Sequence, residues 1–165
     1  IVFDAATGAY KRHWAAYGNR PDDSRMRMFN PESPQFANPV HCVRLGKDQL
    51  VYVCDRTNNR IQVFHKDGSF VREFRVETGT LVNGSVWDLT LSGDPGQSWL
   101  FNTDGENNEV RTLLRSTGAV VGRFGRSGRQ AGDFHWVHNM ARDSKGDLFT
   151  TEVDTGKRVQ RFVPY

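Results

Sequence analysis

The sequence predicts an all-β fold built from repeated four-stranded antiparallel units. Turn-forming Gly, Asn and Asp alternate with aromatic and β-branched residues, and the 165 residues include 16 Gly and 11 Phe, which suits short strands joined by tight reversals. The hydrophobic residues Ile61, Val110 and Val159 occupy the same place in three similar segments, at a constant spacing of 49 residues. One such unit cannot bury both of its faces alone. The fixed period therefore indicates blades stacked around a common axis, a β-propeller.

The unit that contains Ile61 shows the expected blade most clearly. Strands are expected at residues 40–45, 50–53, 60–64 and 69–74. An Asn-Asn pair precedes the third strand and an Asp-Gly pair precedes the fourth, and such pairs supply the positive φ values that tight hairpins need. Four strands joined in this way form an antiparallel meander.

The whole chain, 1–165, is expected to form one partial propeller domain of a little over three blades. In order, the repeats predict the last two strands of a blade, a long loop, two complete blades and the first three strands of the closing blade, at residues 1–18, 19–35, 36–77, 83–126 and 133–165. An arc of this size exposes apolar blade faces at both ends. We therefore expect either a chain cut at its amino end or a second copy that completes the ring. The final unit lacks a fourth strand. This is expected where a strand from the amino end completes the last blade and so closes a propeller.

Charge and hydropathy argue against two classes of partner. The net charge is +3 and the sequence pI is about 9.1, but Arg and Lys are dispersed and do not form the basic runs typical of nucleic-acid arms. Nucleic acid is therefore not the expected partner. The longest apolar runs are only a few residues long, so no membrane span is expected.

The two cysteines, Cys42 and Cys54, fall on adjacent strands of one predicted hairpin. Free buried thiols are the favoured interpretation, because unpaired Cys commonly packs as a small apolar residue. A disulfide or a shared metal site is the alternative. These alternatives are compatible with more than one cellular compartment, and a secreted or periplasmic location is slightly favoured.

Two segments carry a resemblance to the NHL-repeat proteins, including bacterial ones with six-bladed propellers. These segments are Tyr52–Phe64 (YVCDRTNNRIQVF), followed by an Asp-Gly turn, and the inter-blade stretch Phe124–Phe134 (FGRSGRQAGDF). The resemblance covers nearly the whole chain. It is specific for the fold and weak for the activity, because a propeller is a scaffold for unrelated functions.

Within the NHL-like propellers, the chain is similar to peptidyl-α-hydroxyglycine α-amidating lyase, a six-bladed propeller with a zinc ion held by three histidines near the central channel. His41 and His138 each hold the second position of an opening strand, where the lyase has a Pro-His pair. Trp87 holds that position in the intervening blade, where the lyase has an aromatic residue. Arg56 matches an active-site arginine of the lyase.

The resemblance implies a metal site in the channel. Imidazoles from alternate blades can converge on one axis and give zinc its nitrogen ligands with one open position. Arg56 would hold an anionic group of the substrate through its planar fork, while a base accepts a proton as a carbon–nitrogen bond breaks. The third histidine and the tyrosine base of the lyase would precede Ile1. Asn139 stands where the lyase has an aspartate that serves a structural calcium ion, and the resemblance implies that its amide oxygen could still bind calcium, more weakly.

Each of these residues also has a structural interpretation. The two histidines could be repeat residues that hydrogen-bond across the channel mouth, and Arg56 could tie two blades together by pairing with Asp55, Asp88 or another carboxylate. His135 and its neighbour Trp136 are expected to line the channel mouth by packing. Turn formation explains most of the carboxylates in equivalent turns, which are Asp104, Glu106, Glu152 and Asp154.

The sequence therefore supports two functional hypotheses. The first is a zinc-dependent lyase that acts on a small-molecule or peptide substrate at the channel of a complete propeller. The second is a non-catalytic scaffold that binds protein or RNA on one face, which for RNA requires Arg and Lys gathered on that face.

Overall fold

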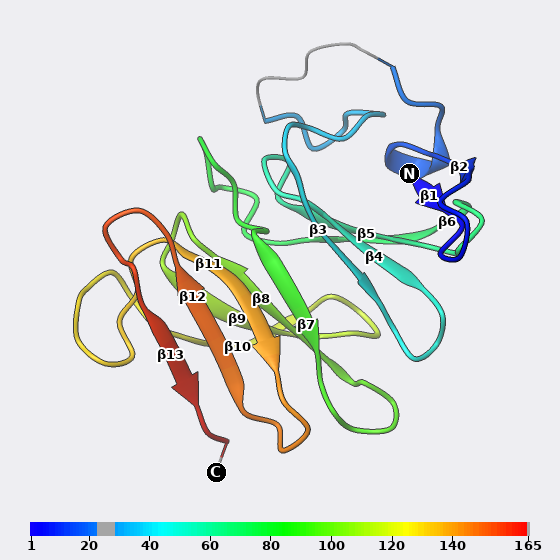
Figure 1. Ribbon diagram of the computed structural model, residues 1–165. Coiled ribbons are helices and arrows are strands. Elements are labelled where there is room, and N and C mark those ends of the chain that lie inside the picture. Colours follow the sequence, from blue (N-terminus) through cyan, green and yellow to red (C-terminus); the bar gives the residue numbers. More distant parts are fainter. Residues whose placement is uncertain (23–28, 165) are drawn as a thin grey trace.

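The computed structural model describes residues 1–22 and 29–164. Their strands form four antiparallel sheets, of two, four, four and three strands in chain order, with no crossing between sheets. The all-β propeller arc predicted from the repeats is confirmed (Figure 1). The elements are β1 (Val2–Phe3), β2 (Tyr10–Arg12), the 3-10 turn η1 (Ala16–Gly18), β3 (Val40–Leu45), β4 (Val51–Asp55), β5 (Arg60–Phe64), β6 (Phe70–Arg75), β7 (Asp88–Leu91), β8 (Trp99–Asp104), β9 (Glu109–Leu114), β10 (Val120–Phe124), β11 (Val137–Arg142), β12 (Leu148–Glu152) and β13 (Val159–Phe162).

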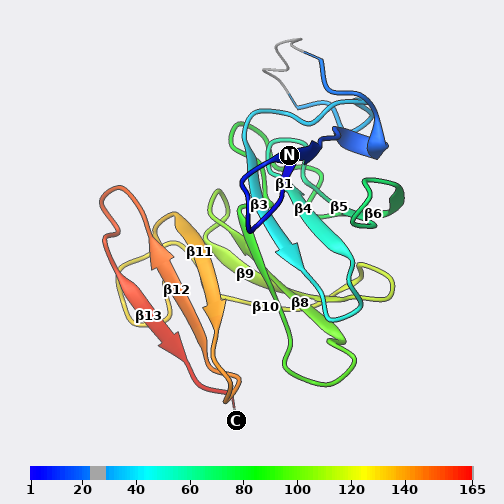
Figure 2. The same ribbon diagram turned by 45° about the vertical axis from the view of Figure 1, so that its right-hand side comes forward.

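The sheets stack face to face rather than extend one another. The first strands of the three larger sheets, β3, β7 and β11, neighbour one another, with β7 between the other two (Figures 1 and 2). One hydrophobic core lies between the β3–β6 and β7–β10 sheets and includes Val76, Leu89 and Leu113. A second core lies between the β7–β10 and β11–β13 sheets and is centred on Phe134 and Met140. This radial stacking is the arrangement of propeller blades.

A buried acid–arginine pair closes the turn between the second and third strands of each larger sheet. Asp55 pairs with Arg60 at 2.7 Å, Asp104 pairs with Arg111, and Glu152 pairs with Arg158 at 3.1 Å. Burial raises the pKa of Asp55 and of Asp104, and the facing arginine opposes that rise. These carboxylates therefore stabilise the turn within each sheet.

Part of the expected long loop covers the inner end of the β3–β6 blade. The fully buried Arg60 donates to the carbonyl oxygens of Pro31, Ser33 and Gln35, each at 3.0 Å. Residues 23–28 of this loop lie outside the described part of the chain. The described part of the loop therefore caps this blade.

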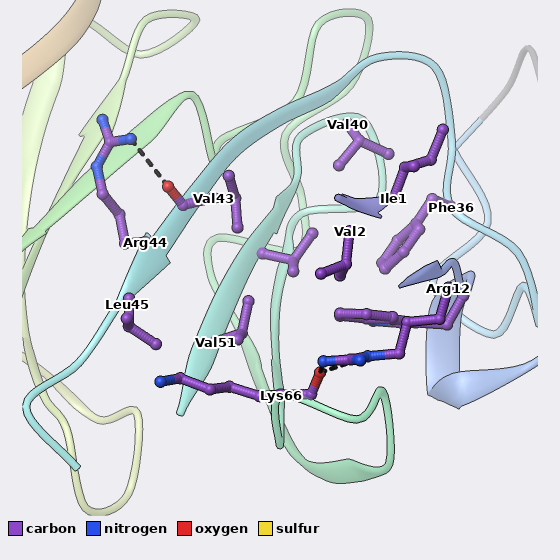
Figure 3. Close-up of a pocket in the computed structure, with 12 residues that line it drawn as sticks. Ile1, Val2, Arg12, Phe36, Val40, Val43, Arg44, Leu45, Val51 and Lys66 are labelled. Atoms are coloured by element: carbon purple, nitrogen blue, oxygen red, sulfur yellow. Dashed lines mark hydrogen bonds between the residues drawn. The ribbon is translucent and has the colours of Figure 1, made fainter. Parts of the chain in front are cut away.

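The outer face of the β3–β4 hairpin is apolar and open. It forms one wall of a cleft of about 620 Å³ whose other wall is the β1–β2 hairpin, with Val40, Val43 and Leu45 at least half exposed (Figure 3). In a closed propeller each blade face packs on a neighbour. An open apolar face of this kind is suited to packing against another sheet. In the described residues no helix has the length and apolar character needed to cross a bilayer.

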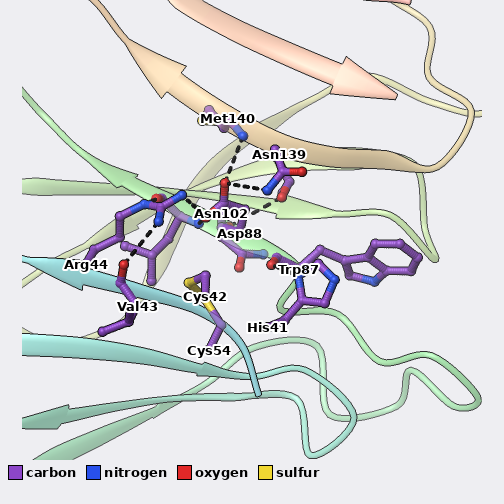
Figure 4. Close-up of a disulfide and its surroundings, with 12 residues drawn as sticks. His41, Cys42, Val43, Arg44, Cys54, Trp87, Asp88, Asn102, Asn139 and Met140 are labelled. Atoms are coloured by element: carbon purple, nitrogen blue, oxygen red, sulfur yellow. Dashed lines mark hydrogen bonds and ion pairs between the residues drawn. A yellow bond between two sulfur atoms is a disulfide. The ribbon is translucent and has the colours of Figure 1, made fainter. Parts of the chain in front are cut away.

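The expectation of free thiols is wrong, because Cys42 and Cys54 form a disulfide (Figure 4). They are direct cross-strand partners in the β3–β4 pair, with Cα atoms 4.8 Å apart. That separation is typical of the narrow pairs in an antiparallel ladder, where side chains approach most closely. The sequence placed the two cysteines on one hairpin, but only the register brings them opposite each other.

Replacing both cysteines with alanine is expected to lower the free energy of unfolding by about 2–3 kcal/mol, because the cross-link restricts the unfolded chain. Chemical unfolding of the wild type and of the Cys42→Ala/Cys54→Ala variant, each with and without reductant, measures the effect. Reductant should destabilise the wild type and leave the variant unchanged. A wild type whose unfolding midpoint survives full reduction, verified by thiol titration, would contradict the expected role.

Candidate functional site

His41 and His138 both lie at β-bulges. In the β3–β4 pair the register shifts between Val40 and Cys42, and in the β11–β12 pair it shifts between Val137 and Asn139. A bulge leaves one residue without a cross-strand partner and re-aims its side chain. The two histidines therefore hold the same special position in two sheets, although the 49-residue repeat aligns them only with a gap of one residue.

The bulges bring the two histidines together across the intervening blade. The imidazole centroids of His41 and His138 lie 4.6 Å apart, and the ring of Trp87, just before β7, lies 5.7 Å and 5.2 Å from them respectively. Sequence reasoning placed all three at equivalent positions of opening strands. The structure shows that the three side chains form one cluster.

The ring of His41 is held by the backbone of the neighbouring blade. Its Nδ1 is hydrogen-bonded to the carbonyl oxygen of Trp87 (Figure 4 shows both residues). Because a carbonyl oxygen only accepts, Nδ1 carries the proton and Nε2 keeps its lone pair. Burial lowers the pKa of His41, which favours this neutral form at neutral pH.

A chain of hydrogen bonds fixes His138 in the same tautomer. The buried carboxylate of Asp88 accepts from Asn139 Nδ2 at 3.3 Å, and Asn139 Oδ1 lies 2.8 Å from His138 Nδ1 (Figure 4 shows Asp88 and Asn139). Because the carboxylate only accepts, the amide nitrogen of Asn139 must face Asp88 and its oxygen must face the ring. His138 Nδ1 therefore donates, and Nε2 keeps its lone pair.

The donor set fits part of a zinc site. Metal-binding histidines typically donate the other ring N–H to a carbonyl or carboxylate partner, and both His41 and His138 have that arrangement. Two imidazoles on one tetrahedral zinc ion have ring centroids about 5 Å apart, given Zn–N bonds of about 2 Å, close to the observed 4.6 Å. The described residues contain no group of three His, Cys, Asp or Glu side chains suited to a metal ion. A catalytic zinc therefore needs at least one more ligand than these residues provide.

The side chain of Asn139 is already engaged on both sides. Its oxygen faces His138 and its nitrogen faces Asp88, so the amide acts as a link between two elements of the cluster. The sequence suggested this residue as a weak calcium ligand. Its contacts in the structure orient His138.

Arg56 lies beside this cluster without a polar partner. Its guanidinium carbon is 4.6 Å from the ring centroid of Trp87, within the range of a cation–π contact. Its Nε is buried and has no hydrogen-bond partner, and burial lowers its pKa while the charge of Glu106 raises it. Within the described residues, the side chain of Arg56 forms no hydrogen bond and no ion pair, while its backbone carbonyl oxygen accepts from the N–H of Asn59. The guanidinium therefore keeps its hydrogen-bond donors available.

Arg56 does not pair with Asp55 or Asp88, two of the carboxylates that the structural interpretation suggested as its partners. Asp55 is bound by Arg60 at 2.7 Å, and Asp88 is bound by Arg44 at 2.5 Å. Each carboxylate is fully buried and is paired with an arginine other than Arg56, so Arg56 does not join two blades through either of them.

His135 and Trp136 extend the cluster toward the surface. The Trp136 ring lies 6.2 Å from that of Trp87 and is stacked on the imidazole of His135 at 5.9 Å. His135 Nε2 is 3.0 Å from Thr155 Oγ1, and it lines a small separate pocket with Arg129 and Arg158. Trp136 is thus linked to the cluster through Trp87, and His135 is linked to it through Trp136.

Sequence reasoning missed the role of Asp88. Its carboxylate accepts from Arg44 of β3 and from the backbone N–H of Met140 in β11, at 2.5 and 2.9 Å, and thus connects three blades. The sequence does contain a feature that could have indicated this role: a charged residue stands in an opening strand directly after Trp87. A carboxylate buried at such a position requires hydrogen-bond partners or a counter-charge.

Comparison with known proteins supports the fold. Residues 40–64 match the NHL repeat. A virginiamycin B lyase from Staphylococcus aureus, a catalytically inactive form with quinupristin, is 14% identical, with 81% of this chain and 44% of that chain covered and a TM-score of 0.56. A hydrazine synthase from Kuenenia stuttgartiensis is 11% identical (86% and 37% covered, TM-score 0.55), and the WD40 β-propeller domain of Doa1 is 15% identical (79% and 40% covered, TM-score 0.54).

These structures differ widely in their stated activities, so the likeness concerns the fold alone. The chain spans less than half the length of each of them. The stacked antiparallel sheets, the match at residues 40–64 and the propeller structures together identify the chain as a stretch of β-propeller that carries an NHL repeat.

Proposed function

We propose that His41 and His138 bind a divalent transition-metal ion, zinc above all, in the channel of an NHL-type propeller with lyase activity. The observation that carries this proposal is the convergence of two bulge histidines whose Nδ1 protons are both committed to acceptors. Both Nε2 lone pairs are thereby free for a metal. The remaining ligand or ligands come from outside the described residues.

Each residue of the site has a separate role in this proposal. His41 and His138 bind the ion, Asp88 and Asn139 orient His138, and Arg56 offers its unpartnered guanidinium to an anionic substrate group. A bound zinc ion would supply Lewis-acid polarisation of a substrate oxygen. The disulfide supports a secreted or periplasmic location as part of this proposal, because structural disulfides persist in oxidising compartments.

Zinc binding by the full chain tests the proposal. Isothermal titration with zinc is expected to show saturable binding, and His41→Ala and His138→Ala should each weaken it at least about tenfold, the scale of a lost metal contact. His65→Ala is the matched control, because His65 is exposed in the turn after β5. Binding should also weaken as the pH falls and the imidazoles are protonated.

Unchanged zinc affinity in both alanine variants would overturn the metal site. Folded protein that binds no zinc would favour the alternative function, a non-catalytic scaffold that binds protein or RNA. Circular dichroism of each variant establishes that a loss of binding is not a loss of fold.

A further inference from the structure

We propose that a cleft between the β3–β6 and β7–β10 sheets binds a phosphate group through the guanidinium groups of Arg72 and Arg115 and the hydroxyl of Tyr52. The site lies beside the turn that follows β3, whereas His41 lies near the start of that strand. It is therefore separate from the proposed metal site, and the inference does not depend on that proposal.

The cleft has a volume of about 490 Å³ and two walls from different sheets. Tyr52 of β4 and Arg72 of β6 form one wall, while Gly96, Ser98 and residues 114–116 form the other. A phosphate group fills only part of this volume, which leaves room for an organic group attached to it. A cleft into which a few polar side chains converge is typical of small-ligand sites.

Arg72 brings a positive charge that no acid neutralises. Its Nη1 donates to the carbonyl oxygen of Ser116 at 3.2 Å, a contact that reaches from β6 to the turn after β9 in the neighbouring sheet. Among the described residues this is the only hydrogen bond of the side chain, and no carboxylate there forms an ion pair with it. The carbonyl contact thus holds the guanidinium at the cleft, and its Nε and Nη2 are available to an anion.

Arg115 is anchored along one edge and leaves donors accessible. Its Nη2 donates to Asp48 Oδ2 at 2.8 Å, and its guanidinium carbon lies 6.0 Å from the ring centroid of Tyr52. Within the part of the chain that the structure describes, its Nε and Nη1 have no hydrogen-bond partner, and neither atom is buried. A planar guanidinium held in this way presents its remaining donors in a fixed direction, which suits an oxyanion.

Tyr52 adds a third donor to the cleft. Its hydroxyl lies 3.5 Å from Asp48 Oδ2. Burial raises the pKa of Tyr52, while the charges of Arg115 and Arg72 oppose the rise, so both guanidiniums act on this hydroxyl. The three donor groups come from β4, β6 and the turn after β9. A tetrahedral oxyanion has oxygen atoms in several directions to meet them, whereas the two oxygens of a carboxylate lie in one plane.

The next junction between sheets shows that the fold does not require these polar groups. The 49-residue spacing and the strand pairing give the equivalent positions one repeat later. The equivalents of Tyr52, Arg72 and Arg115 are Phe101, Gly122 and Pro164 respectively. One hydroxyl and two guanidiniums are thus present together at one junction and absent together from the other, which favours a shared role over a role in blade packing.

The charges around the cleft favour an anion. Asp48 is paired with Arg115, and the carboxylate of Asp94 accepts hydrogen bonds from serines of its own turn. The amino group of Lys47 lies 3.4 Å from the carbonyl oxygen of Asp94. Three cationic side chains, with Arg72 the third, therefore face two carboxylates, and the surplus positive charge attracts an anion.

Isothermal titration of the full chain with inorganic phosphate, in chelator and at low ionic strength, tests the site. We expect saturable binding that is at least about tenfold weaker in Arg72→Gln and in Arg115→Gln, because each variant loses a charge-assisted hydrogen bond. Tyr52→Phe, which introduces the residue of the equivalent position, should weaken binding about threefold, the scale of a neutral hydrogen bond. Circular dichroism establishes that each variant is folded.

The matched control is Arg123→Gln, because Arg123 is an arginine of the equivalent edge strand β10 with 68% of its side chain exposed. This variant should bind phosphate like the wild type. Equal weakening in Arg123→Gln would indicate general attraction to a basic surface and would overturn the site. Unchanged affinity in both Arg72→Gln and Arg115→Gln, or absence of saturation, would overturn it as well.

Two further ligands define the chemistry of the site. Acetate should bind at least about tenfold more weakly than phosphate, because it offers fewer oxygen atoms to the three donors, and equal affinity would contradict a phosphate site. Glycerol 2-phosphate distinguishes the source of the phosphate group: tighter binding than inorganic phosphate indicates a phosphate ester, and weaker binding indicates the free ion. Because chelator is present throughout, these results are independent of the zinc titration.

Discussion

Replacing Arg60 with leucine is expected to lower the free energy of unfolding by about 3–5 kcal/mol, the scale measured when one partner of a buried ion pair is removed. The arginine side chain is fully buried, and its Nε lies 2.7 Å from Asp55 Oδ2. It also donates to three carbonyl oxygens of the loop that covers the blade and to the hydroxyl of Tyr17. Leucine would leave the buried Asp55 carboxylate without its counter-charge and these acceptors without donors.

Chemical unfolding of Arg60→Leu against the wild type measures this loss, and Arg75→Leu is the matched control. Arg75 pairs with Glu32 at 2.7 Å, but both side chains are substantially exposed, and pairs of this kind contribute about 1 kcal/mol or less. Equal losses in the two variants would show that burial of Arg60 does not set its contribution.

The deficit of Arg60→Leu should depend on pH. Burial already raises the pKa of Asp55, and the charge of Arg60 opposes the rise, so the folded-state pKa should rise further in the variant. A group whose folded-state pKa lies above its unfolded-state value loses stability as the pH rises through the folded-state pKa. The variant should therefore recover part of its stability as the pH falls from neutrality toward the ordinary pKa of aspartate, and a deficit independent of pH in this range would contradict the assignment.

Replacing Asp88 with alanine is expected to lower the free energy of unfolding by about 3 kcal/mol. Its fully buried carboxylate receives Arg44 and the backbone N–H of Met140, so three blades lose a shared acceptor. Breaking a buried pair costs about 3–5 kcal/mol, and the low end applies because 37% of the Arg44 side chain is exposed and can be solvated. Thermal and chemical unfolding give the measurement.

The same substitution should release the tautomer of His138. Without the carboxylate, the amide of Asn139 is free to turn, and His138 Nδ1 loses its fixed acceptor. Long-range nitrogen–proton NMR of the imidazole should show one tautomer in the wild type and a mixture in Asp88→Ala, with His41 unchanged because its acceptor is the Trp87 carbonyl. A single unaltered His138 tautomer in the variant would rule out the positioning role of Asp88.

Much of the fold could be predicted because the determinants are local and repeated. Strands β3 and β5 begin and end where the hydrophobic pattern predicted them, at Val40–Leu45 and Arg60–Phe64. The turn pairs between them specify reversals through backbone conformations that Asn and Gly adopt readily. Because the units repeat, the strand order of one unit also holds for the next. One unit cannot bury both of its faces alone, so the repeat also predicted that the sheets stack.

The site was predictable only in outline. The repeat placed His41, Trp87 and His138 at equivalent positions, but it did not reveal that each histidine lies at a β-bulge. A bulge depends on how two strands pair, which no single segment encodes. For the same reason the sequence left Cys42 and Cys54 as free thiols, although the register places them directly opposite.

The amino-acid sequence by itself determined the all-β repeat and the turn positions, because these depend on side-chain pattern within about ten residues. The tertiary structure alone decided which arginine meets which carboxylate. Arg60 and Arg56 lie four positions apart in one turn, yet Asp55 binds the first and leaves the second free beside Trp87. Asp55 and Arg60 are direct cross-strand partners in the β4–β5 pair, so strand register brings them together, and both are fully buried in the packed structure. Register and burial exist only once the strands have paired and the sheets have packed.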